Sequence, residues 1–179
     1  MQKLLIFPLN GNGLEALQCI GGQFDFIGFV DDTPEKRGTS KLGFEVYGRE
    51  AIQRYKDAKI LAVLGSPGTY LLREKVISGL EVDPSRFATV IHPNASISGM
   101  AKIGHNILIM SGGVITANAI IGNHVCMLPN SVVHHDCIVG DYTLIGSNVT
   151  IAGYTRIGTN CYIGSGSRII NSIEIGNRS

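Results

Sequence analysis

The feature that most constrains the fold of this chain is a six-residue period that runs from Ile91 to Ile175. Neither an α-helix, with 3.6 residues per turn, nor a strand, with its period of two, produces this spacing. A triangular coil does produce it, with three short strands per turn and a corner after each strand. The sequence therefore predicts a prism of stacked strands whose interior is filled by the aliphatic residues of the period, namely Ile91, Ile97, Ile103, Ile109, Ile115, Ile121, Met127, Val133, Val139, Ile145, Ile151, Ile157, Ile163, Ile169 and Ile175.

A longer period of eighteen residues supports the same architecture. Glycine follows the stacked aliphatic residue at positions one full turn apart, namely Gly104, Gly122, Gly140, Gly158 and Gly176. Since eighteen is three sixes, one turn of the coil returns each corner to a place above itself. Asparagine tolerates positive φ better than most non-glycine residues, so it suits sharp corners. We expect such corners three residues after the aliphatic position, at Asn94, Asn106, Asn118, Asn130, Asn148 and Asn160.

The composition limits the partners and the location of the chain. Charged residues make up only 16% of the sequence, against about 25% in typical soluble domains. This indicates surface that is buried between subunits, and we expect a homotrimer because three-sided prisms pack naturally about a three-fold axis.

The net charge of +1 and the lack of basic runs argue against a nucleic-acid partner. No apolar stretch is long enough to span a membrane, and we expect a cytoplasmic protein.

The first 88 residues show a different pattern, typical of a small α/β unit. Buried strands are expected at 3–9, 24–30 and 59–64, and helices at 14–20, 49–55 and 71–80, with a loop at 33–48. A strand, a glycine-containing turn, a helix, a second strand and the acidic pair Asp31–Asp32 follow one another in the order of a Rossmann-like unit. We therefore expect two domains, a Rossmann-like domain over residues 1–88 and the prism over residues 89–179.

The ends of the three predicted N-terminal strands carry the polar residues of a candidate ligand site. Parallel sheets bind ligands beyond the carboxyl ends of their strands, and a glycine turn before a helix can present backbone N–H groups to a phosphate. A plain structural turn is the alternative, since the turn holds only two glycines. The expected substrate-binding residues are Asn10, Gly11, Asn12, Asp31, Asp32, Gly65 and Ser66.

A second candidate site lies at one corner of the prism. By the six-residue register, His134, His135 and Asp136 fall at a corner, while Val133 and Cys137 point inward. The eighteen-residue period places the small residues Ala117 and Gly153 below and above His135, which leaves space around its imidazole. A histidine base, a neighbouring carboxylate and a nearby backbone N–H are the groups that acyl transfer requires. The alternative is a solvated corner with two histidines.

The repeat region resembles the hexapeptide-repeat acyltransferases. The whole chain resembles a narrower group within them, the sugar O-acyltransferases of the sialic acid O-acetyltransferase type together with the N-acetyltransferases of nucleotide-linked 4-amino sugars. This resemblance implies a left-handed parallel β-helix, a nucleotide-sugar-binding N-terminal domain and a trimer with acetyl-CoA bound between prisms. It also implies a role in surface-glycan biosynthesis. The matching stretches are Phe29-Val30-Asp31-Asp32, Leu64-Gly65-Ser66, Ile91-His92-Pro93 and His135-Asp136-Cys137-Ile138-Val139-Gly140-Asp141.

The resemblance also implies roles for individual residues. His135 is then the general base with Asp136 as its partner, and Gly153, one coil above, lies against the thioester. Leu144 stands where the family commonly has a histidine next to the cofactor, and Arg168 occupies an outward position from which it could meet CoA phosphates. The chain ends at Ser179 in the middle of a coil, where family members continue through further coils.

Two alternatives bear on the function. A non-catalytic trimer that binds a nucleotide sugar fits the replacement of the usual histidine by Leu144. A γ-class carbonic anhydrase shares the prism, but its zinc site needs two histidines five residues apart, and the sequence offers no such pair. The four cysteines likewise lack metal-ligand spacing, so no metal is expected. The sequence leaves open whether the acceptor is an amine or a hydroxyl, which sugar carries it and which acyl group is transferred.

Overall fold

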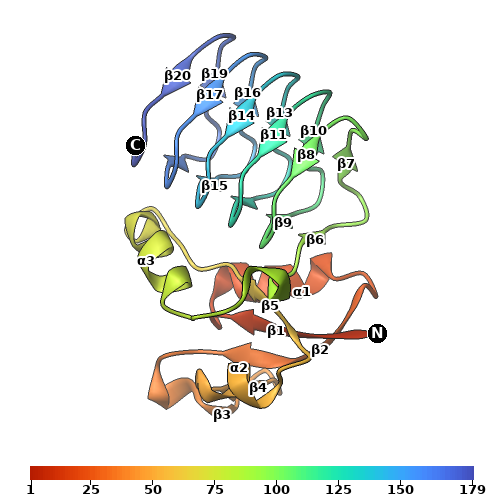
Figure 1. Ribbon diagram of the computed structural model, residues 1–179, viewed down its shortest axis with the longest axis vertical. Helices are drawn as coiled ribbons and strands as arrows, with labels where there is room; N and C mark the ends of the chain where they lie inside the picture. The colour runs from red at the N-terminus through yellow and green to blue at the C-terminus, as the bar shows by residue number, and fades with distance from the viewer.

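A computed structural model describes residues 1–179 and shows a parallel β-helix over the C-terminal half of the chain (Figure 1). Each of its strands is two residues long and ends at an aliphatic residue of the six-residue period. The strands are β6 (Val90–Ile91), β7 (Ser96–Ile97), β8 (Lys102–Ile103), β9 (Leu108–Ile109), β10 (Val114–Ile115), β11 (Ile120–Ile121), β12 (Cys126–Met127), β13 (Val132–Val133), β14 (Ile138–Val139), β15 (Leu144–Ile145), β16 (Thr150–Ile151), β17 (Arg156–Ile157), β18 (Tyr162–Ile163), β19 (Arg168–Ile169) and β20 (Glu174–Ile175).

The strands of the β-helix form three parallel sheets, one for each face of the prism. Their orders are β18-β15-β12-β9-β6, β19-β16-β13-β10-β7 and β20-β17-β14-β11-β8. Each strand pairs with the strand eighteen residues away, as in the pair Ile115 and Val133. The aliphatic residues therefore stack in one continuous core, which also holds the small inward residues Ala119, Cys137 and Cys161. Burial of this apolar surface is the main stabilising term of such a coil.

The corners contain one left-handed residue in every six from Asn106 to Arg178. The expected asparagines take this conformation except Asn94, for which the prediction is wrong. The ring Nδ1 of His92 accepts a hydrogen bond from the Asn94 N–H, and the carbonyl of His92 accepts one from Ala95. This side-chain bond closes the first corner without a positive φ. Later corners place other residues in the left-handed region, among them Asp136 at φ 59° and Tyr154 at φ 63°.

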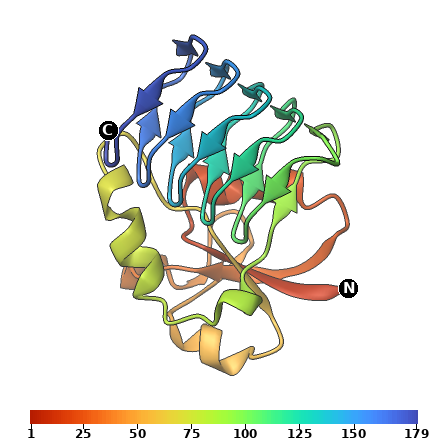
Figure 2. The ribbon, with the colours of Figure 1, turned by 45° about the horizontal axis from the view of Figure 1, so that its top comes forward.

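Residues 1–88 form a five-stranded sheet of order β3-β4-β2-β1-β5, in which only β3 runs antiparallel to its neighbour. Helix α1 and the β-helix cover one face of this sheet, while α2 and α3 contribute to the core on the other face (Figure 2). The elements are β1 (Gln2–Phe7), α1 (Gly11–Cys19), β2 (Phe24–Val30), β3 (Gly38–Thr39), β4 (Glu45–Tyr47), α2 (Glu50–Arg54), β5 (Lys59–Ala62) and α3 (Arg73–Ser78), with short 3-10 turns at Pro34–Lys36, Tyr70–Leu72 and Pro84–Arg86.

The prediction of an N-terminal Rossmann-like domain is wrong, because the architecture is that of a parallel β-helix with few helices. The connection between β2 and the parallel strand β4 contains no α-helix, only a 3-10 turn and the two-residue strand β3. Pro34 and the glycines at 38 and 43 interrupt any helical period in this stretch. Helices α2 and α3 are only five and six residues long. None of the helices is long and apolar enough to cross a membrane.

A buried arginine joins the N-terminal residues to the β-helix. Arg73 is fully buried, and burial lowers the pKa of its guanidinium. The guanidinium donates hydrogen bonds to the backbone carbonyls of Leu64, His124 and Tyr142. A hydrophobic cluster that includes Leu4, Val63, Leu108 and Leu144 runs across the same boundary. The sheet and the outer side of the β-helix therefore share one hydrophobic cluster.

The buried corner residue His124 should make the stability of the protein depend on pH. Burial, with the nearby His105 and Arg73, lowers the pKa of His124 to about 4, so the folded protein keeps this imidazole neutral. The unfolded chain takes up the proton below about pH 6.5. The contribution of His124 to the free energy of unfolding is therefore fully present above that pH and is lost as the pH falls toward 4. We expect the free energy of unfolding to drop by about 2 kcal/mol between pH 7 and pH 5 through this residue.

Urea unfolding of the wild type and of His124→Asn measures this effect. Asparagine is the matched replacement, because Asn106 and Asn160 occupy the same corner one coil below and two coils above in the same left-handed conformation. The variant should lose stability less steeply than the wild type between pH 7 and pH 5. Parallel pH profiles for the two proteins would contradict the assignment.

Candidate active site

His135 and Asp136 lie at the corner between β13 and β14, as the register predicts. The Nδ1 atom of His135 is 2.9 Å from Oδ2 of Asp136. The backbone N–H of Asp136 donates to the carbonyl of Ala117, and that of Tyr154 donates to the carbonyl of His135. These ladder bonds fix His135 between the coil below and the coil above. Its side chain is 46% exposed, so it is open to solvent within a single chain.

The carboxylate of Asp136 orients the imidazole of His135. Because the carboxylate only accepts hydrogen bonds, Nδ1 carries the proton and Nε2 keeps its lone pair. The pKa of Asp136 is lowered by its hydrogen bonds with His135 and with the side-chain amide of Asn118. The carboxylate therefore stays ionised at neutral pH, and Nε2 of His135 is available as a base.

Gly153 packs directly against the imidazole from the coil above. A Cβ at this position would lie 2.8 Å from Cε1 and 2.9 Å from Nε2 of His135, closer than real Cβ atoms approach other atoms. The carbonyl of Gly153 accepts from Ser172, whereas its N–H donates to no group of the chain. This unused backbone N–H, on the residue that packs against the imidazole, is a donor of the kind that binds a developing oxyanion.

Two residues that the sequence reasoning missed complete this corner. Asn118 donates to Oδ1 of Asp136 at 3.1 Å, and the ring of Tyr154 meets the edge of the His135 imidazole at a centroid distance of 5.1 Å. Each is eighteen residues from Asp136, one coil below or one coil above. The eighteen-residue period could have identified both residues, had it been applied to Asp136 as well as to His135.

The predicted cofactor residues Leu144 and Arg168 lie away from His135. Leu144 is almost fully buried between the β-helix and the N-terminal sheet, so its side chain offers no surface to a cofactor. The exposed Arg168 donates to the backbone carbonyls of Asn148, Gly166 and Ser167. Gly166 and Ser167 belong to the corner before β19, and Asn148 belongs to the corner before β16, one coil below. The corner of His135 follows β13, so it lies on the other side of the sheet that contains β13, β16 and β19. Neither residue is brought to His135 within one chain.

The polar residues at the ends of β1 and β5 contact one another. Asn10 caps α1, and its side chain accepts from the N–H of Gly13. The side chain of Asn12 donates to the carbonyls of Val63 and Gly65, each at 3.2 Å. Gly65 has a φ of +131°, and a Cβ there would meet the side chain of Arg73. Gly11 is exposed with open space where a side chain would be.

The acidic residues at the end of β2 are already paired within the chain. Asp31 is buried and accepts from the N–H groups of Leu9 and Thr33 and from Lys36. Burial opposes its ionisation, but the hydrogen bonds from Thr33 and Lys36 outweigh burial and lower the pKa of Asp31. Asp32 forms an ion pair with Arg49. At the end of β5, the hydroxyl of Ser66 pairs with that of Thr69.

A basic pocket lies beside these strand ends. Its volume is about 260 Å³, and three cationic side chains line it together with Glu35, Leu9, Thr39 and Ser40. The cations are Lys36, Arg37 and Lys41. Lys36 is already paired with Asp31, so Arg37 and Lys41 are the cations that could bind phosphate groups by charge-assisted hydrogen bonds. The sequence reasoning placed these residues in a loop and assigned them no role, although the spacing of the three cations was visible.

A family of repeat proteins matches the centre of the β-helix. Residues 118–153 match the family described as bacterial transferase hexapeptide (six repeats). This stretch includes Asn118, His135, Asp136 and Gly153. No curated protein matches the chain.

Solved structures of similar shape cover nearly the whole chain. A variant of perosamine N-acetyltransferase from Caulobacter crescentus, in complex with CoA and GDP-perosamine, has a TM-score of 0.84 at 21% identity over 99% of this chain and 83% of that one. The acetyltransferase domain of PglB from Neisseria gonorrhoeae, in complex with acetyl coenzyme A, has a TM-score of 0.71 at 19% identity over 98% and 96%. WeeI from Acinetobacter baumannii has a TM-score of 0.78 at 26% identity over 93% and 79%.

These comparisons confirm the resemblance that the sequence motifs indicated. The repeat match covers the corner that carries His135, and the shape matches extend through the N-terminal sheet. The chain carries the transferase hexapeptide repeat and shares the fold of the sugar acetyltransferases of this type.

Proposed function

We propose that this protein is an acetyl-CoA-dependent sugar acetyltransferase. The observation that carries the proposal is the corner of His135, where Nδ1 of His135 lies 2.9 Å from Asp136, and where Gly153, whose N–H has no partner in the chain, packs against the imidazole. An oriented base and an oxyanion donor at one position are what acyl transfer requires. The similar structures solved with CoA or acetyl coenzyme A support acetyl-CoA as the co-substrate.

His135 removes a proton from the amine or hydroxyl of the acceptor as that group attacks the thioester carbonyl. The N–H of Gly153 stabilises the negative charge that develops on the carbonyl oxygen. The ionised Asp136 stabilises the imidazolium of His135 and holds its orientation. When the intermediate collapses, the carbon–sulfur bond breaks and the imidazolium returns its proton to the departing thiolate.

The acceptor in this proposal is a nucleotide-linked sugar held by residues 1–88, while residues 89–179 carry out the transfer. The basic pocket of Lys36, Arg37 and Lys41 suits a diphosphate, and it lies next to Asn10 and Gly11 at the start of α1. The GDP-perosamine bound to the Caulobacter enzyme supports this substrate class.

The four cysteines are free and buried, which agrees with a reducing compartment and supports the cytoplasmic location.

The active protein is a homotrimer in this proposal. Neither pocket of the chain includes His135, although acyl transfer requires a site that excludes water. A neighbouring prism packed against this corner would close the site. We expect sedimentation equilibrium at micromolar concentration to give three times the chain mass of 19.2 kDa. A stable monomer under these conditions would count against the assembly.

An acetylation assay tests the function directly. Purified protein is incubated with acetyl-CoA and a set of nucleotide-linked 4-amino sugars and their hydroxyl analogues, and free thiol and acetylated product are measured. We expect product from at least one acceptor. Nucleotide-sugar binding by thermal shift without any product would favour a non-catalytic binding protein.

A further inference from the structure

The carboxylate of Asp136 has one partner on each of its two oxygens. Oδ2 lies 2.9 Å from Nδ1 of His135, and Oδ1 accepts from the side-chain amide of Asn118 at 3.1 Å. Because a carboxylate only accepts hydrogen bonds, the amide nitrogen of Asn118 faces it. No lysine or arginine forms an ion pair with Asp136. Besides the imidazole itself, Asn118 is therefore the one side chain that holds this carboxylate.

The backbone places the side chains of Asn118 and Asp136 one above the other. The two residues are eighteen positions apart, and both occupy left-handed corners, with φ of 60° and 59°. The N–H of Asp136 donates to the carbonyl of Ala117, which keeps the two corners in register. Asparagine enters the left-handed region more readily than most residues. This corner therefore accepts, at low cost, a side chain that can donate to the coil above.

A second asparagine–aspartate pair with the same spacing shows what a purely structural pair does. Oδ1 of Asp141 accepts the backbone N–H of Asn123 at 2.7 Å and so closes the corner below it. The carboxylate of Asp136, by contrast, accepts no backbone N–H, and both of its bonds are with side chains. The coil does not need this carboxylate to close a corner. What the bond with Asn118 sets is the direction in which the carboxylate faces His135.

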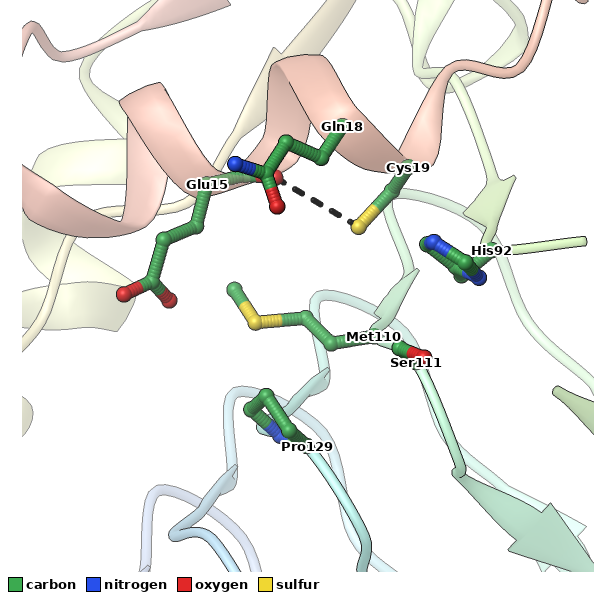
Figure 3. Close-up of a pocket in the computed structure, with 7 residues that line it drawn as sticks. All are labelled: Glu15, Gln18, Cys19, His92, Met110, Ser111 and Pro129. Carbon is green, nitrogen blue, oxygen red and sulfur yellow. Dashed lines mark hydrogen bonds between the residues drawn. The ribbon is translucent and has the colours of Figure 1, made fainter. Parts of the chain in front are cut away.

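The pockets of the chain supply no other partner for Asp136. The pocket shown in Figure 3 lies between α1 and the corner that follows β6, β9 and β12. The whole sheet β19-β16-β13-β10-β7 separates that corner from Asp136. The basic pocket lies beside the ends of β1 and β2, and neither pocket is lined by Asp136 or Asn118. The orientation of the carboxylate is therefore set within its own corner.

We propose that Asn118 is a positioning residue, which selects the tautomer of His135 by fixing the carboxylate of Asp136. While Asn118 holds Oδ1, Oδ2 faces Nδ1, so Nδ1 carries the proton and Nε2 keeps its lone pair. Without this bond the carboxylate, which is 33% exposed, turns toward water, and the imidazole takes both tautomers. The inference deepens the proposed function and rests on it only for the effect on rate, since the tautomer exists without any substrate.

Nitrogen NMR of the full-length protein with isotope-labelled histidine measures the tautomer directly. At about pH 8, above the ordinary titration range of histidine, we expect His135 of the wild type to carry its proton on Nδ1. Its signals are those that His135→Ala lacks. Asn118→Asp keeps the size of the side chain and suits the left-handed corner, but it replaces the donor by an acceptor. His135 should then become a mixture of tautomers, and Asn118→Gly should give the same mixture.

Asn148→Asp is the matched control for this measurement. Asn148 also occupies a left-handed corner, at φ 55°, and its side chain forms no hydrogen bond. The substitution therefore adds the same charge at the same kind of corner without touching Asp136. The Nδ1 tautomer of His135 should persist in this variant.

A double-mutant cycle tests whether Asn118 acts through Asp136. Asn118→Gly removes the side chain where glycine meets no steric cost. It should lower kcat by about tenfold and leave KM unchanged for both substrates, because a misplaced base costs rate. The same change in the Asp136→Asn protein should cost less than about twofold, since the carboxylate on which it acts is gone. A merely structural role would lower kcat by the same factor in both proteins.

Three results would overturn the proposal: persistence of the Nδ1 tautomer in Asn118→Asp and Asn118→Gly, a mixture of tautomers in the wild type, or an equal loss of kcat in the two backgrounds. Absence of acetyl transfer by the wild type would instead contradict the proposed function. In that case the tautomer of His135 in the wild type and in the two Asn118 variants would still decide whether Asn118 positions the imidazole.

Discussion

His135→Ala should lower kcat of acetyl transfer by about 10²- to 10⁴-fold, which is the usual contribution of a positioned general base. The variant removes the imidazole whose Nε2 is proposed to accept the proton of the acceptor. The backbone bonds of this corner, from the Asp136 N–H to Ala117 and from the Tyr154 N–H to the carbonyl of residue 135, do not involve the imidazole, so the coil should keep its structure. Steady-state kinetics of thiol release, together with acetyl-CoA binding by calorimetry, measure the effect.

Two neighbouring residues provide the controls for this result. His134→Ala should have a much smaller effect, because His134 has no ion pair with Asp136 and lies in the column of Thr116 and Ala152 rather than below Gly153. Asp136→Asn should reduce kcat less than His135→Ala, since it disturbs the orientation of the base without removing it. Near wild-type turnover in His135→Ala would exclude the proposed mechanism, and a greater loss in His134→Ala would move the base to that residue.

Gly153→Ala should lower kcat by about a hundredfold without unfolding the β-helix. The added methyl group would lie 2.8 Å from the His135 ring, so the imidazole has to move. A displacement of about 1 Å is enough to cost a rate of this size when the reacting atoms are held in place. Because His135 is partly exposed, the ring can swing outward, and the loss should appear in kcat and not in thermal stability.

Gly99→Ala is the matched control, because Gly99 occupies the same corner column three coils below Gly153. A Cβ at Gly99 would contact nothing within 4 Å, and neither glycine has a positive φ. This variant should retain the activity of the wild type. Equal activity of the two glycine variants would mean that contact with Gly153 does not set the position of the base.

The sequence was sufficient to predict the β-helix and its candidate catalytic corner, because their information is local and repeated. Each six-residue unit specifies one strand and one corner, so the stacking of Ala117, His135 and Gly153 follows from counting alone. The one wrong corner prediction is Asn94 in the first coil. There the side chain of His92 closes the turn by a hydrogen bond, and no residue takes the left-handed conformation. The proposed roles of His135, Asp136 and Gly153 remain predictions.

The N-terminal residues could not be predicted to the same depth, because their contacts occur once and join distant residues. The pattern of strand, turn, helix and acidic pair suggested a Rossmann-like domain, although the loop expected at 33–48 already left no helix between β2 and β4. Nor does any period indicate that Leu4 and Val63 pack with Leu108 and Leu144. Arg73 gives no sign in the sequence that it is buried. The basic pocket likewise arises from how the loop after β2 folds back on Leu9.

The bonds of Arg73 have a consequence for how this protein tolerates change. All three of its acceptors are main-chain oxygens, so its recognition of the β-helix does not depend on which side chains occupy positions 124 and 142. Substitutions there leave those oxygens in place as long as the coil keeps its path. Related chains could therefore vary these side chains, within the residue types that a left-handed corner accepts, while the arginine still held the N-terminal sheet against the same two coils. Insertion of anything other than a whole turn of eighteen residues would, by contrast, move the oxygens out of reach.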